Sequence, residues 1–383
     1  MKSDVSVQPI SQTLVARLRQ VIDPRRVHTD AADIDLYKRD ASNIEGRAGV
    51  VCFPTTTSEV QNLVRVCAEF KQPFVARGSG TGLSGGATPL DGAVVISTAK
   101  MNQLISVDPI NRTAWIEPGM LNLDLTREVA HLGLHFAPDP SSQQSCTIGG
   151  NVANNSGGPH CLADGVTSSH ILACEVVLSD GSLVVLGGEE PEPIGLDLRG
   201  AFIGSEGMFG ITTKICVRLM QNYSSVRTML MDFTSVQAGA ETVSAIIAAG
   251  MVPAALEMMD QLCLEAVEAY IHAGLPTDAA AALLVEVSGL PHAVNEETER
   301  ISDIGRAHGA RTIRVAQDEA ERALLWKGRK TAFGAIARIK PNYYLHDTVV
   351  PRRKLNEVLQ EVYRIAREHD LLVLNVFHAG DGN

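Results

Sequence analysis

The sequence predicts an α+β protein with two domains behind a short helical segment. The chain has 383 residues, which is more than one hydrophobic core usually serves. Up to about residue 225, glycine-rich loops follow the predicted strands, whereas beyond it strands and helices alternate without such loops. This change predicts a helical lead-in over residues 1–45, a first domain over 46–225 and a second domain over 226–383.

Composition and charge narrow the class of protein. Hydrophobic residues make up 45% of the chain and charged residues 20%, as in globular proteins. The net charge is −11 without a long basic cluster, so no nucleic-acid partner is expected. Neither a signal peptide nor an apolar run of membrane-spanning length is visible. Seven cysteines without CxxC spacing indicate reduced thiols, so we expect a cytoplasmic protein without its own iron–sulfur cluster.

The first domain begins with a β-α-β unit. Residues 49–54 (GVVCFP) and 73–76 (PFVA) are predicted to be short apolar strands. Ser58 is the expected N-cap of the helix between them. The helix is predicted from apolar residues at the i, i+3, i+4, i+7 spacing of one face, namely Val60, Leu63, Val64 and Cys67.

Five further strands are predicted in this domain. Asp180-Gly181 is a hairpin signal between two of them. The last, ITTKICVRL, alternates strictly and predicts one face that carries Ile211 and Thr213 with the apolar residues after them. The strands cover 93–97, 113–119, 171–178, 182–188 and 211–219.

The second domain is predicted to be an antiparallel sheet covered by helices on one face, because its strands and helices alternate. The predicted strands cover 228–233, 254–260, 281–287, 311–316, 343–351 and 371–379. The predicted helices cover 235–249, 261–272, 294–308, 318–335 and 353–369.

Five of the eleven residues in RGSGTGLSGGA, residues 77–87, are glycine. Glycine tolerates positive φ, and successive backbone N–H groups in such a loop can cradle an anion, most naturally a diphosphate. Gly80, Gly82 and Gly85 have the G-x-G-x-x-G spacing of a Rossmann fold. That fingerprint requires a helix directly afterwards, but a turn and a strand follow here. A Walker A loop is excluded because no Gly-Lys-Ser/Thr is present.

Two further loops have the same character. Residues 138–159 contain four glycines and three asparagines between Thr147 and Pro159, and asparagine also tolerates the left-handed conformation. Gly204, Gly207 and Gly210 precede the alternating strand. Together the three loops predict one large ligand with a diphosphate, a ribose and a flat ring system.

In their order, RGSGTGLSGG, PDPSS…TIGGNVANNSGG and IGSEGMFGITT resemble the vanillyl-alcohol-oxidase/PCMH family of FAD-linked oxidases. Within it, LEMMDQL, QDEAERALLWKGRKTAFGAIARIKPNYYLHDTVVPRRKL and NVFHAGDGN resemble the group of glycolate oxidase flavin subunits. The resemblance implies a PCMH-type FAD-binding domain of two α/β subdomains. It also implies an antiparallel cap that holds the substrate over the isoalloxazine and that is expected to be incomplete at its C-terminus.

The resemblance also implies which residues hold FAD. Some relatives bind FAD covalently through a histidine in the first loop, where this chain has Ser79, Gly80 and Thr81, so non-covalent FAD is expected. Around the pyrophosphate we expect Arg77, Gly78, Ser79, Gly80, Thr81, Gly82, Gly85 and Gly86. Along the rest of the cofactor we expect Pro138, Asp139, Ser141, Thr147, Gly149, Gly150, Asn151, Asn154 and Gly158, with Glu206 and Ile211 near the adenosine or ribose.

Arg329, in WKGRK, matches an arginine that binds the substrate carboxylate in related 2-hydroxy-acid dehydrogenases. A planar guanidinium suits that task because it can bind a carboxylate with two parallel hydrogen bonds. Spacing alone would predict a solvated arginine on a charged helix. Those relatives also have a threonine and a lysine where Phe333 and, approximately, Leu345 stand here. This departure implies a small substrate rather than a dicarboxylate.

His378 opens HAGDGN, which resembles H-x-G-D-G-N-x-H. In relatives the two histidines and a later glutamate hold a divalent metal, which can act as a Lewis acid on the substrate. The second histidine and the later segment, with its expected base, would lie beyond Asn383. A buried histidine satisfied by hydrogen bonds is the alternative for His378.

The resemblance implies FAD-dependent oxidation of a small 2-hydroxy acid, glycolate to glyoxylate or D-lactate to pyruvate. Electrons would pass to partner subunits, one an iron–sulfur protein and one with a second flavin domain, or to a respiratory acceptor. Such partners could hold the protein at the periphery of the inner membrane. Two alternatives are a cytochrome-linked D-lactate or D-2-hydroxyglutarate dehydrogenase and a flavin-binding protein without catalysis, as the missing segment would predict.

Overall fold

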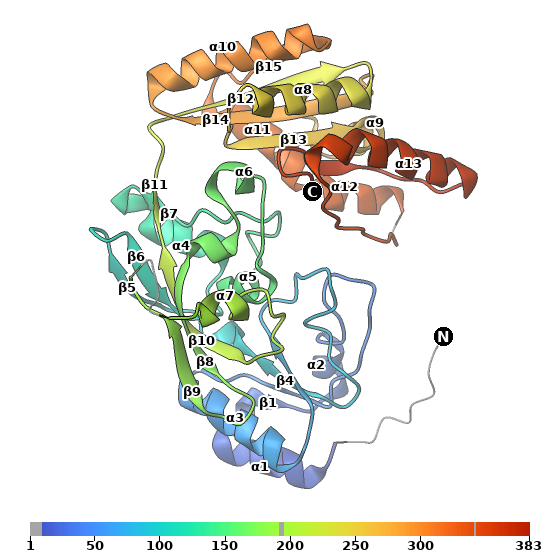
Figure 1. Ribbon diagram of the computed structural model, residues 1–383. Coiled ribbons are helices and arrows are strands. Elements are labelled where there is room, and N and C mark those ends of the chain that lie inside the picture. The colour runs from blue at the N-terminus through green and yellow to red at the C-terminus, as the bar shows by residue number, and fades with distance from the viewer. Residues whose placement is uncertain (1–9, 191–194, 341) are drawn as a thin grey trace. The chain divides into compact units, whose positions relative to one another are not determined.

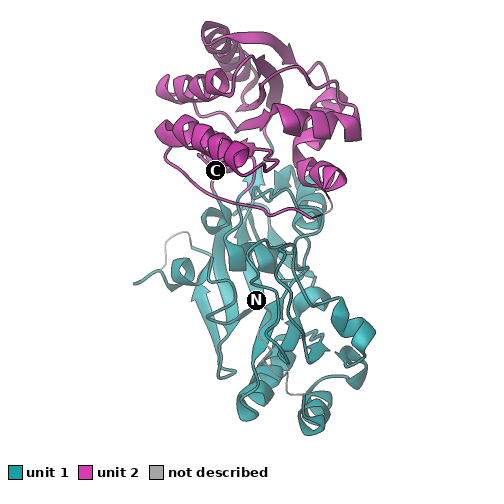
Figure 2. Ribbon diagram, turned by 90° about the vertical axis from the view of Figure 1, so that its right-hand side faces the viewer, with its two compact units in different colours: residues 1–157, 166–222 teal, residues 158–165, 223–383 magenta. Residues whose placement is uncertain are grey.

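The computed structural model describes residues 10–190, 195–340 and 342–383 and divides into two compact units (Figure 2). The first comprises Met1–Gly157 and Val166–Asn222, and the second comprises Gly158–Gly165 and Tyr223–Asn383. The second unit thus begins three residues before the expected boundary. It also takes in a short excursion from the second glycine loop, which the sequence did not indicate. Residues 1–9 of the expected lead-in lie outside the described residues.

The first sheet of the first unit has the order β1-β2-β4-β3, from Val27–His28, Val50–Cys52, Val94–Ser97 and Phe74–Arg77. The last three strands are parallel, and β1 pairs antiparallel with β2. Helices α1 (Gln12–Val21) and α3 (Thr57–Glu69) pack their apolar side chains into the core of this sheet. The expected lead-in is therefore part of this subdomain. Between these elements lie η1 (Pro24–Arg26), α2 (Ala31–Asp35) and η2 (Thr98–Lys100).

The N-cap of α3 differs from the expected Ser58. Thr56 occupies that position, and its hydroxyl accepts a hydrogen bond of 3.2 Å from the backbone N–H of Glu59. Three polar residues precede the helix here, and the pattern alone does not distinguish which of them has the extended backbone of a cap.

The second sheet has the order β5-β6-β10-β8-β9 and is antiparallel throughout. Its strands are Leu104–Asp108, Thr113–Ile116, Ile211–Arg218, Ile171–Val177 and Leu183–Gly187. Strand β10 is buried on both faces, so its alternation does not mark one buried face as expected. The two sheets are the two subdomains that the sequence predicted. The remaining elements are α4 (Asn122–Val129), η3 (Ala130–Leu132), β7 (Leu134–His135), α5 (Ile148–Asn154), η4 (Thr167–His170), α7 (Leu198–Phe202) and β11 (Met220–Gln221).

The second unit contains one five-stranded antiparallel sheet, as predicted. Its order is β15-β12-β14-β13-β16. The strands are β12 (Ser225–Phe233), β13 (Ala255–Asp260), β14 (Ala281–Gly289), β15 (Ala310–Val315) and β16 (Val376–His378). The short helix α6 (Cys161–Asp164) belongs to the excursion that joins this unit.

Helices cover both faces of this sheet, so the expectation of one covered face is wrong (Figure 1). On one face lie α8 (Val236–Ala248), α10 (Pro291–Ala307) and α13 (Leu355–Glu368). On the other lie α9 (Gln261–Ile271), α11 (Glu319–Lys330) and α12 (Ala332–Ile339). The reason is visible in β12, where Met229 and Met231 enter the first core while Leu230 enters the second. A nearly continuous apolar run indicates a strand buried on both sides.

The end of this unit is less regular than predicted. The expected helix over 318–335 is divided at Thr331, whose hydroxyl donates to the carbonyl of Lys327 at 2.7 Å. Residues 343–351 form no strand, and Tyr344 and Val349 remain largely exposed because no sheet face covers them. Only Val376–His378 of the last expected strand pairs with β13. Within the described ranges, no helix is long and apolar enough to cross a membrane.

Candidate active site

The first glycine loop follows β3 and offers unpaired backbone donors. Gly80 and Gly85 have φ values of +73° and +82°, in the left-handed region that glycine tolerates best. Ser79 and Gly82 are exposed, and Thr81 is half-buried. Among the described residues, no N–H group of residues 79–86 donates a hydrogen bond to the protein. Such a run of free N–H groups fits an anionic ligand such as a diphosphate.

The first loop lies against both other glycine loops. A Cβ atom added to Gly78 would come within 2.2 Å of Thr147 Oγ1, in the second loop. A Cβ atom added to Gly86 would come within 2.3 Å of Glu206 Oε2, in the third loop. Both distances are far below a normal carbon–oxygen contact, so a side chain at either position would have to displace Thr147 or the end of the Glu206 side chain. The structure therefore brings together the three segments predicted to hold one ligand.

The second and third loops are joined by hydrogen bonds. Thr147 caps α5, and its Oγ1 accepts from the N–H of Gly150 at 3.2 Å. The Asn154 amide donates to Glu206 Oε1 at 2.7 Å. The N–H of Glu206 in turn donates to the carbonyl of Ala153 at 2.8 Å. These contacts hold four predicted FAD residues close together, namely Thr147, Gly150, Asn154 and Glu206.

The guanidinium of Arg77 holds the backbone of the first glycine loop in place. It is buried, and it donates to the carbonyls of Ala87 at 3.0 Å and Arg39 at 2.9 Å. It also lies over the Tyr37 ring, 5.3 Å from its centroid. Burial lowers the pKa of Arg77, although the nearby charge of Asp40 opposes that effect. Arg77 thus shapes the loop, and its expected contact with pyrophosphate stays a prediction.

Asn122, which the sequence did not single out, organises the second loop. Its buried side-chain amide donates to the carbonyl of Pro138 at 2.8 Å and to Asn151 Oδ1 at 2.9 Å. Asn122 thereby fixes two predicted FAD residues that lie far apart in the chain. It lies at the start of a helix with no glycine beside it, so no local signal marked it.

The other predicted FAD residues have varied surroundings. Asp139 is buried, whereas Ser141 is half-buried. A side chain at Gly149 would collide with Pro118, so this glycine serves close backbone packing. Gly158 belongs to the second unit, where its N–H donates to the Cys161 sulfur at 2.9 Å. Ile211 begins β10 with its side chain in the core of the first subdomain.

Several buried oxygens around the loops lack a hydrogen-bond partner within the described part of the chain. They are Asp40 Oδ2, Ser97 Oγ, Asn122 Oδ1 and Ser205 Oγ. Asp40 is only 6% exposed, and a Cβ atom added to Gly82 would lie 3.9 Å from this Oδ2. Buried polar atoms are normally satisfied, so these oxygens fit a ligand that carries hydroxyl or N–H donors. Together with the free N–H groups of the first loop, they fit FAD.

In the second unit, Arg329 is buried in an ion pair and is not the solvated arginine that spacing alone predicts. Its side chain is only 3% exposed, on the face of α11 that meets the sheet. Nε and Nη2 both contact Glu257 Oε2, at 2.7 and 2.6 Å. Within the described residues Nη1 takes part in no hydrogen bond. One edge of the guanidinium is therefore fixed, and Nη1 is left for another acceptor.

His378 shares the same carboxylate. It lies on β16, whose register places it opposite Glu257 on β13, and its Nδ1 is 2.8 Å from Glu257 Oε1. An ionised carboxylate can only accept, so Nδ1 carries a proton, and in the neutral ring Nε2 is then the acceptor nitrogen. Glu257 is fully buried and joins the two predicted catalytic residues. The sequence reasoning missed it, although one charge inside AALEMMD was an available signal.

The surroundings of this trio hold further carboxyl groups. Burial raises the pKa of Asp381, an effect that Glu257 reinforces and that His378 and Arg352 oppose. Nevertheless, the described residues form no group of three or more His, Cys, Asp or Glu side chains that could hold a metal ion. These residues do not make a metal centre by themselves, and the role of His378 as a metal ligand stays a prediction.

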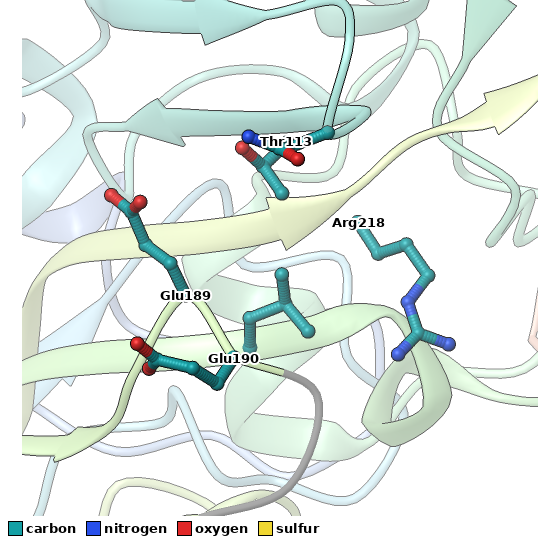
Figure 3. Close-up of a pocket in the computed structure, with 6 residues that line it drawn as sticks. Thr113, Glu189, Glu190 and Arg218 are labelled. Carbon is teal, nitrogen blue, oxygen red and sulfur yellow. The ribbon is translucent and has the colours of Figure 1, made fainter.

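A surface depression in the first unit is not this site. It has a volume of about 380 Å³, and Figure 3 shows Glu189, Glu190 and Arg218 around it. Asn111, Thr113 and Leu172 complete its lining. These residues belong to the outer part of the second sheet, outside the three glycine loops. Its mixed charges give no reason to place a diphosphate there.

Two protein families match consecutive parts of the chain. Residues 48–187 match the FAD binding domain family, and residues 223–383 match the family of FAD linked oxidases, C-terminal domain. Glycolate oxidase subunit GlcD of Escherichia coli K12 is 44% identical, over 93% of this chain and 72% of that protein. GlcD of Bacillus subtilis is 38% identical, over 98% and 80%. A D-lactate dehydrogenase of Anaerostipes hadrus is 30% identical, over 100% and 82%.

Solved structures share the fold. A 4-ethylphenol oxidase from Gulosibacter chungangensis has a TM-score of 0.81 at 18% identity, over 96% of this chain and 81% of that one. A p-cresol methylhydroxylase has a TM-score of 0.73 at 19% identity, over 85% and 72%. The predicted PCMH-type domain and antiparallel cap are confirmed by these matches.

Proposed function

The chain belongs to the FAD-linked oxidase family that includes the glycolate oxidase subunits GlcD, and from this membership we propose that it oxidises a small 2-hydroxy acid with FAD. The reaction is glycolate to glyoxylate or D-lactate to pyruvate. The observation that carries the proposal is the buried Glu257, which holds both Arg329 and His378 in the unit that matches the oxidase family.

The first unit binds the cofactor. The free N–H groups of the first loop would hold the diphosphate of FAD, and the buried oxygens around the loops would accept hydrogen bonds from its hydroxyl and N–H groups. Bound FAD supplies a hydride acceptor for the hydrogen on the substrate α-carbon. Ser79, Gly80 and Thr81 provide no histidine for a covalent bond, which supports non-covalent FAD.

Arg329 binds the substrate carboxylate in the second unit. Glu257 fixes the Nε edge of the guanidinium, and Nη1 offers its hydrogens to the substrate. The geometry supports this assignment, because Glu257 already holds the guanidinium in place and little conformational freedom is lost when Nη1 binds a carboxylate. Arg329 would bind the carboxylate of any small 2-hydroxy acid in the same way, so this contact alone does not select among these substrates.

We assign His378 the role of the base, which receives the hydroxyl proton at Nε2, instead of the metal-ligand role that the resemblance implies. Glu257 holds the ring through Nδ1, keeps Nε2 as the acceptor and stabilises the imidazolium that forms. Phe333 on α12 and Leu345 stand where related dehydrogenases of dicarboxylates have a threonine and a lysine, which supports a monocarboxylate substrate.

The electrons from the substrate would pass on to another protein. Two relatives are named as subunits of glycolate oxidase, which supports an assembly of several chains. Six of the seven cysteines are buried, away from any position where they could share a cluster at the surface, which supports an iron–sulfur partner rather than a cluster in this chain. A D-lactate dehydrogenase is the second candidate, because the D-lactate dehydrogenase of Anaerostipes hadrus is 30% identical over the whole chain.

Anaerobic mixing tests the proposal. The FAD-loaded protein is combined with glycolate, D-lactate, L-lactate or D-2-hydroxyglutarate, and the visible absorption of the flavin is followed. We expect glycolate or D-lactate to bleach it and D-2-hydroxyglutarate to leave it unchanged. Protein that binds FAD and is bleached by none of the four acids would contradict the proposal and favour flavin binding without catalysis.

A further inference from the structure

A second buried carboxylate lies on the same sheet face as Glu257. Glu286, on β14, is only 2% exposed. Its oxygens accept from Arg322 Nε and Nη2 at 3.0 Å each and from Trp326 Nε1 at 2.5 Å. Thr228 donates to it as well, and His160 Nε2 lies 3.1 Å away. Burial raises the pKa of Glu286, but hydrogen bonds from His160 and Arg322 outweigh it and bring the pKa to about 2.

The two carboxylates match two arginines on α11. Arg322 and Arg329 are seven residues apart, which is two turns and about 10 Å along a helix. Glu286 pairs with Ala255 in the sheet, so Glu257 is its diagonal neighbour, about 8 Å away by sheet geometry. Helix α11 is therefore docked on the sheet at two points. The Glu286 contacts fix where along the sheet Arg329 meets Glu257.

His160 connects this cluster to the chain that leaves the FAD loop. The predicted FAD residues of the second loop end at Gly158, which together with the following residues to Gly165 belongs to the second unit. Three contacts hold this segment there. His160 also stacks near Trp326, with ring centroids 5.1 Å apart, Leu162 packs beside Gly380, and Tyr223 donates to Asp164 at 2.8 Å.

We propose that Glu286 and His160 are positioning residues for the 2-hydroxy-acid site. Glu286 gathers Arg322 and Trp326 onto the sheet and so sets Arg329 in place to bind the substrate carboxylate. His160, in the segment that follows the second glycine loop, holds the carboxylate of Glu286 in place. Neither residue touches substrate. This inference rests on the proposed function, because the assignment of Arg329 to the substrate carboxylate is part of it.

The expected kinetic signature follows from what Arg329 does. The substrate carboxylate is bound both before the reaction and during it, so a displaced Arg329 weakens both states equally. Such a loss raises KM and leaves kcat nearly unchanged. A residue that only stabilises the fold would lower the melting temperature without changing KM of the folded enzyme.

The test compares His160→Leu, His160→Gln and Glu286→Gln in the complete FAD-loaded protein. Losing one hydrogen bond to the charged Glu286 should raise KM for the accepted hydroxy acid about tenfold in His160→Leu. His160→Gln keeps a donor and should recover most of that loss, while Glu286→Gln should have at least the effect of His160→Leu. Flavin content should match the wild type. His292→Leu, on the exposed side of α10, is the matched control and should change nothing.

A second measurement does not depend on turnover. Hydrogen exchange over residues 319–330, without substrate, should be faster in His160→Leu and Glu286→Gln than in the wild type and in His292→Leu. Unchanged KM together with unchanged exchange, whatever the melting temperature, would overturn the proposal. If the wild type oxidises no hydroxy acid but the exchange rates differ as expected, the proposed function fails while the positioning of α11 stands.

Discussion

The first unit presents its ligand with backbone, whereas the second presents its substrate with buried charges. Around the FAD loops, the surface is formed by free N–H groups and by two glycines, Gly78 and Gly86, at which an added Cβ atom would come within 2.2–2.3 Å of a neighbouring loop. On the sheet of the second unit, Glu257 and Glu286 each hold an arginine and a histidine inside the protein. A backbone site loses function when a side chain is added. A charge site loses it when a side chain is removed.

The largest expected effect comes from removing one charge of the second unit. Arg329→Met should reduce kcat/KM for the hydroxy acid at least about a thousandfold, because the carboxylate loses its partner. It also leaves Glu257 buried and uncompensated, which should cost about 3–5 kcal/mol of unfolding free energy. Kinetics and urea denaturation measure the two effects, and flavin content should remain near that of the wild type.

Arg306→Met is the matched control for that substitution. Arg306 makes an exposed ion pair with Asp303 at 2.7 Å, and such pairs contribute little. It should therefore change neither kcat/KM nor stability measurably. If Arg329→Met kept kcat/KM within tenfold of the wild type, Arg329 would not be the carboxylate-binding residue, and the contrast between the two units would lose its main support.

The next effect is the pH dependence of the second unit. The pKa of Glu286 is about 2 against an ordinary value of 4.5, so its contribution is complete above pH 4.5 and is lost as pH falls toward 2. That difference corresponds to about 3 kcal/mol. Burial raises the pKa of Asp260, which works in the opposite direction. Urea denaturation at several pH values should show the loss, and Glu286→Gln should show a flatter profile below pH 4.5.

The sequence alone predicted the site residues of the first unit better than those of the second, for a physical reason. A glycine loop is a local pattern, so the three FAD segments were recognisable one by one. The carboxylate pairs join residues far apart in the chain, such as Glu257 with Arg329 and with His378. No spacing within a strand or helix reveals them, and the apolar run around Glu257 reads simply as a buried strand. The role of Asn122 was missed for the same reason, because its partners Pro138 and Asn151 lie far from it in the chain.

A smaller effect is expected from adding one methyl group to the first unit. In Gly78→Ala, the new Cβ would lie 2.2 Å from Thr147 Oγ1, so the first two loops must separate. Overpacking of this kind costs about 1–3 kcal/mol, and we expect FAD affinity to fall about 10- to 100-fold. Titration of the apoprotein with FAD measures it. Gly334→Ala, with no atom within 4 Å of the new Cβ, should bind FAD as the wild type does.

The smallest effect compares the same device, a helix N-cap, in both units. Thr147 caps α5 beside the FAD loop, and Asp318 caps α11, with Oδ1 accepting from the N–H of Glu321 at 2.8 Å. Replacing either by alanine should cost about 1 kcal/mol of unfolding free energy. The two variants should differ in their effects on function. Thr147→Ala loosens the cofactor loop and should lower FAD affinity about fivefold. Asp318→Ala should leave FAD affinity unchanged and raise only KM for the hydroxy acid. Thr147→Ser keeps the capping oxygen and should restore FAD affinity. If both alanine variants lowered FAD affinity equally, the assignment of FAD binding to the first unit and of substrate binding to the second would be wrong.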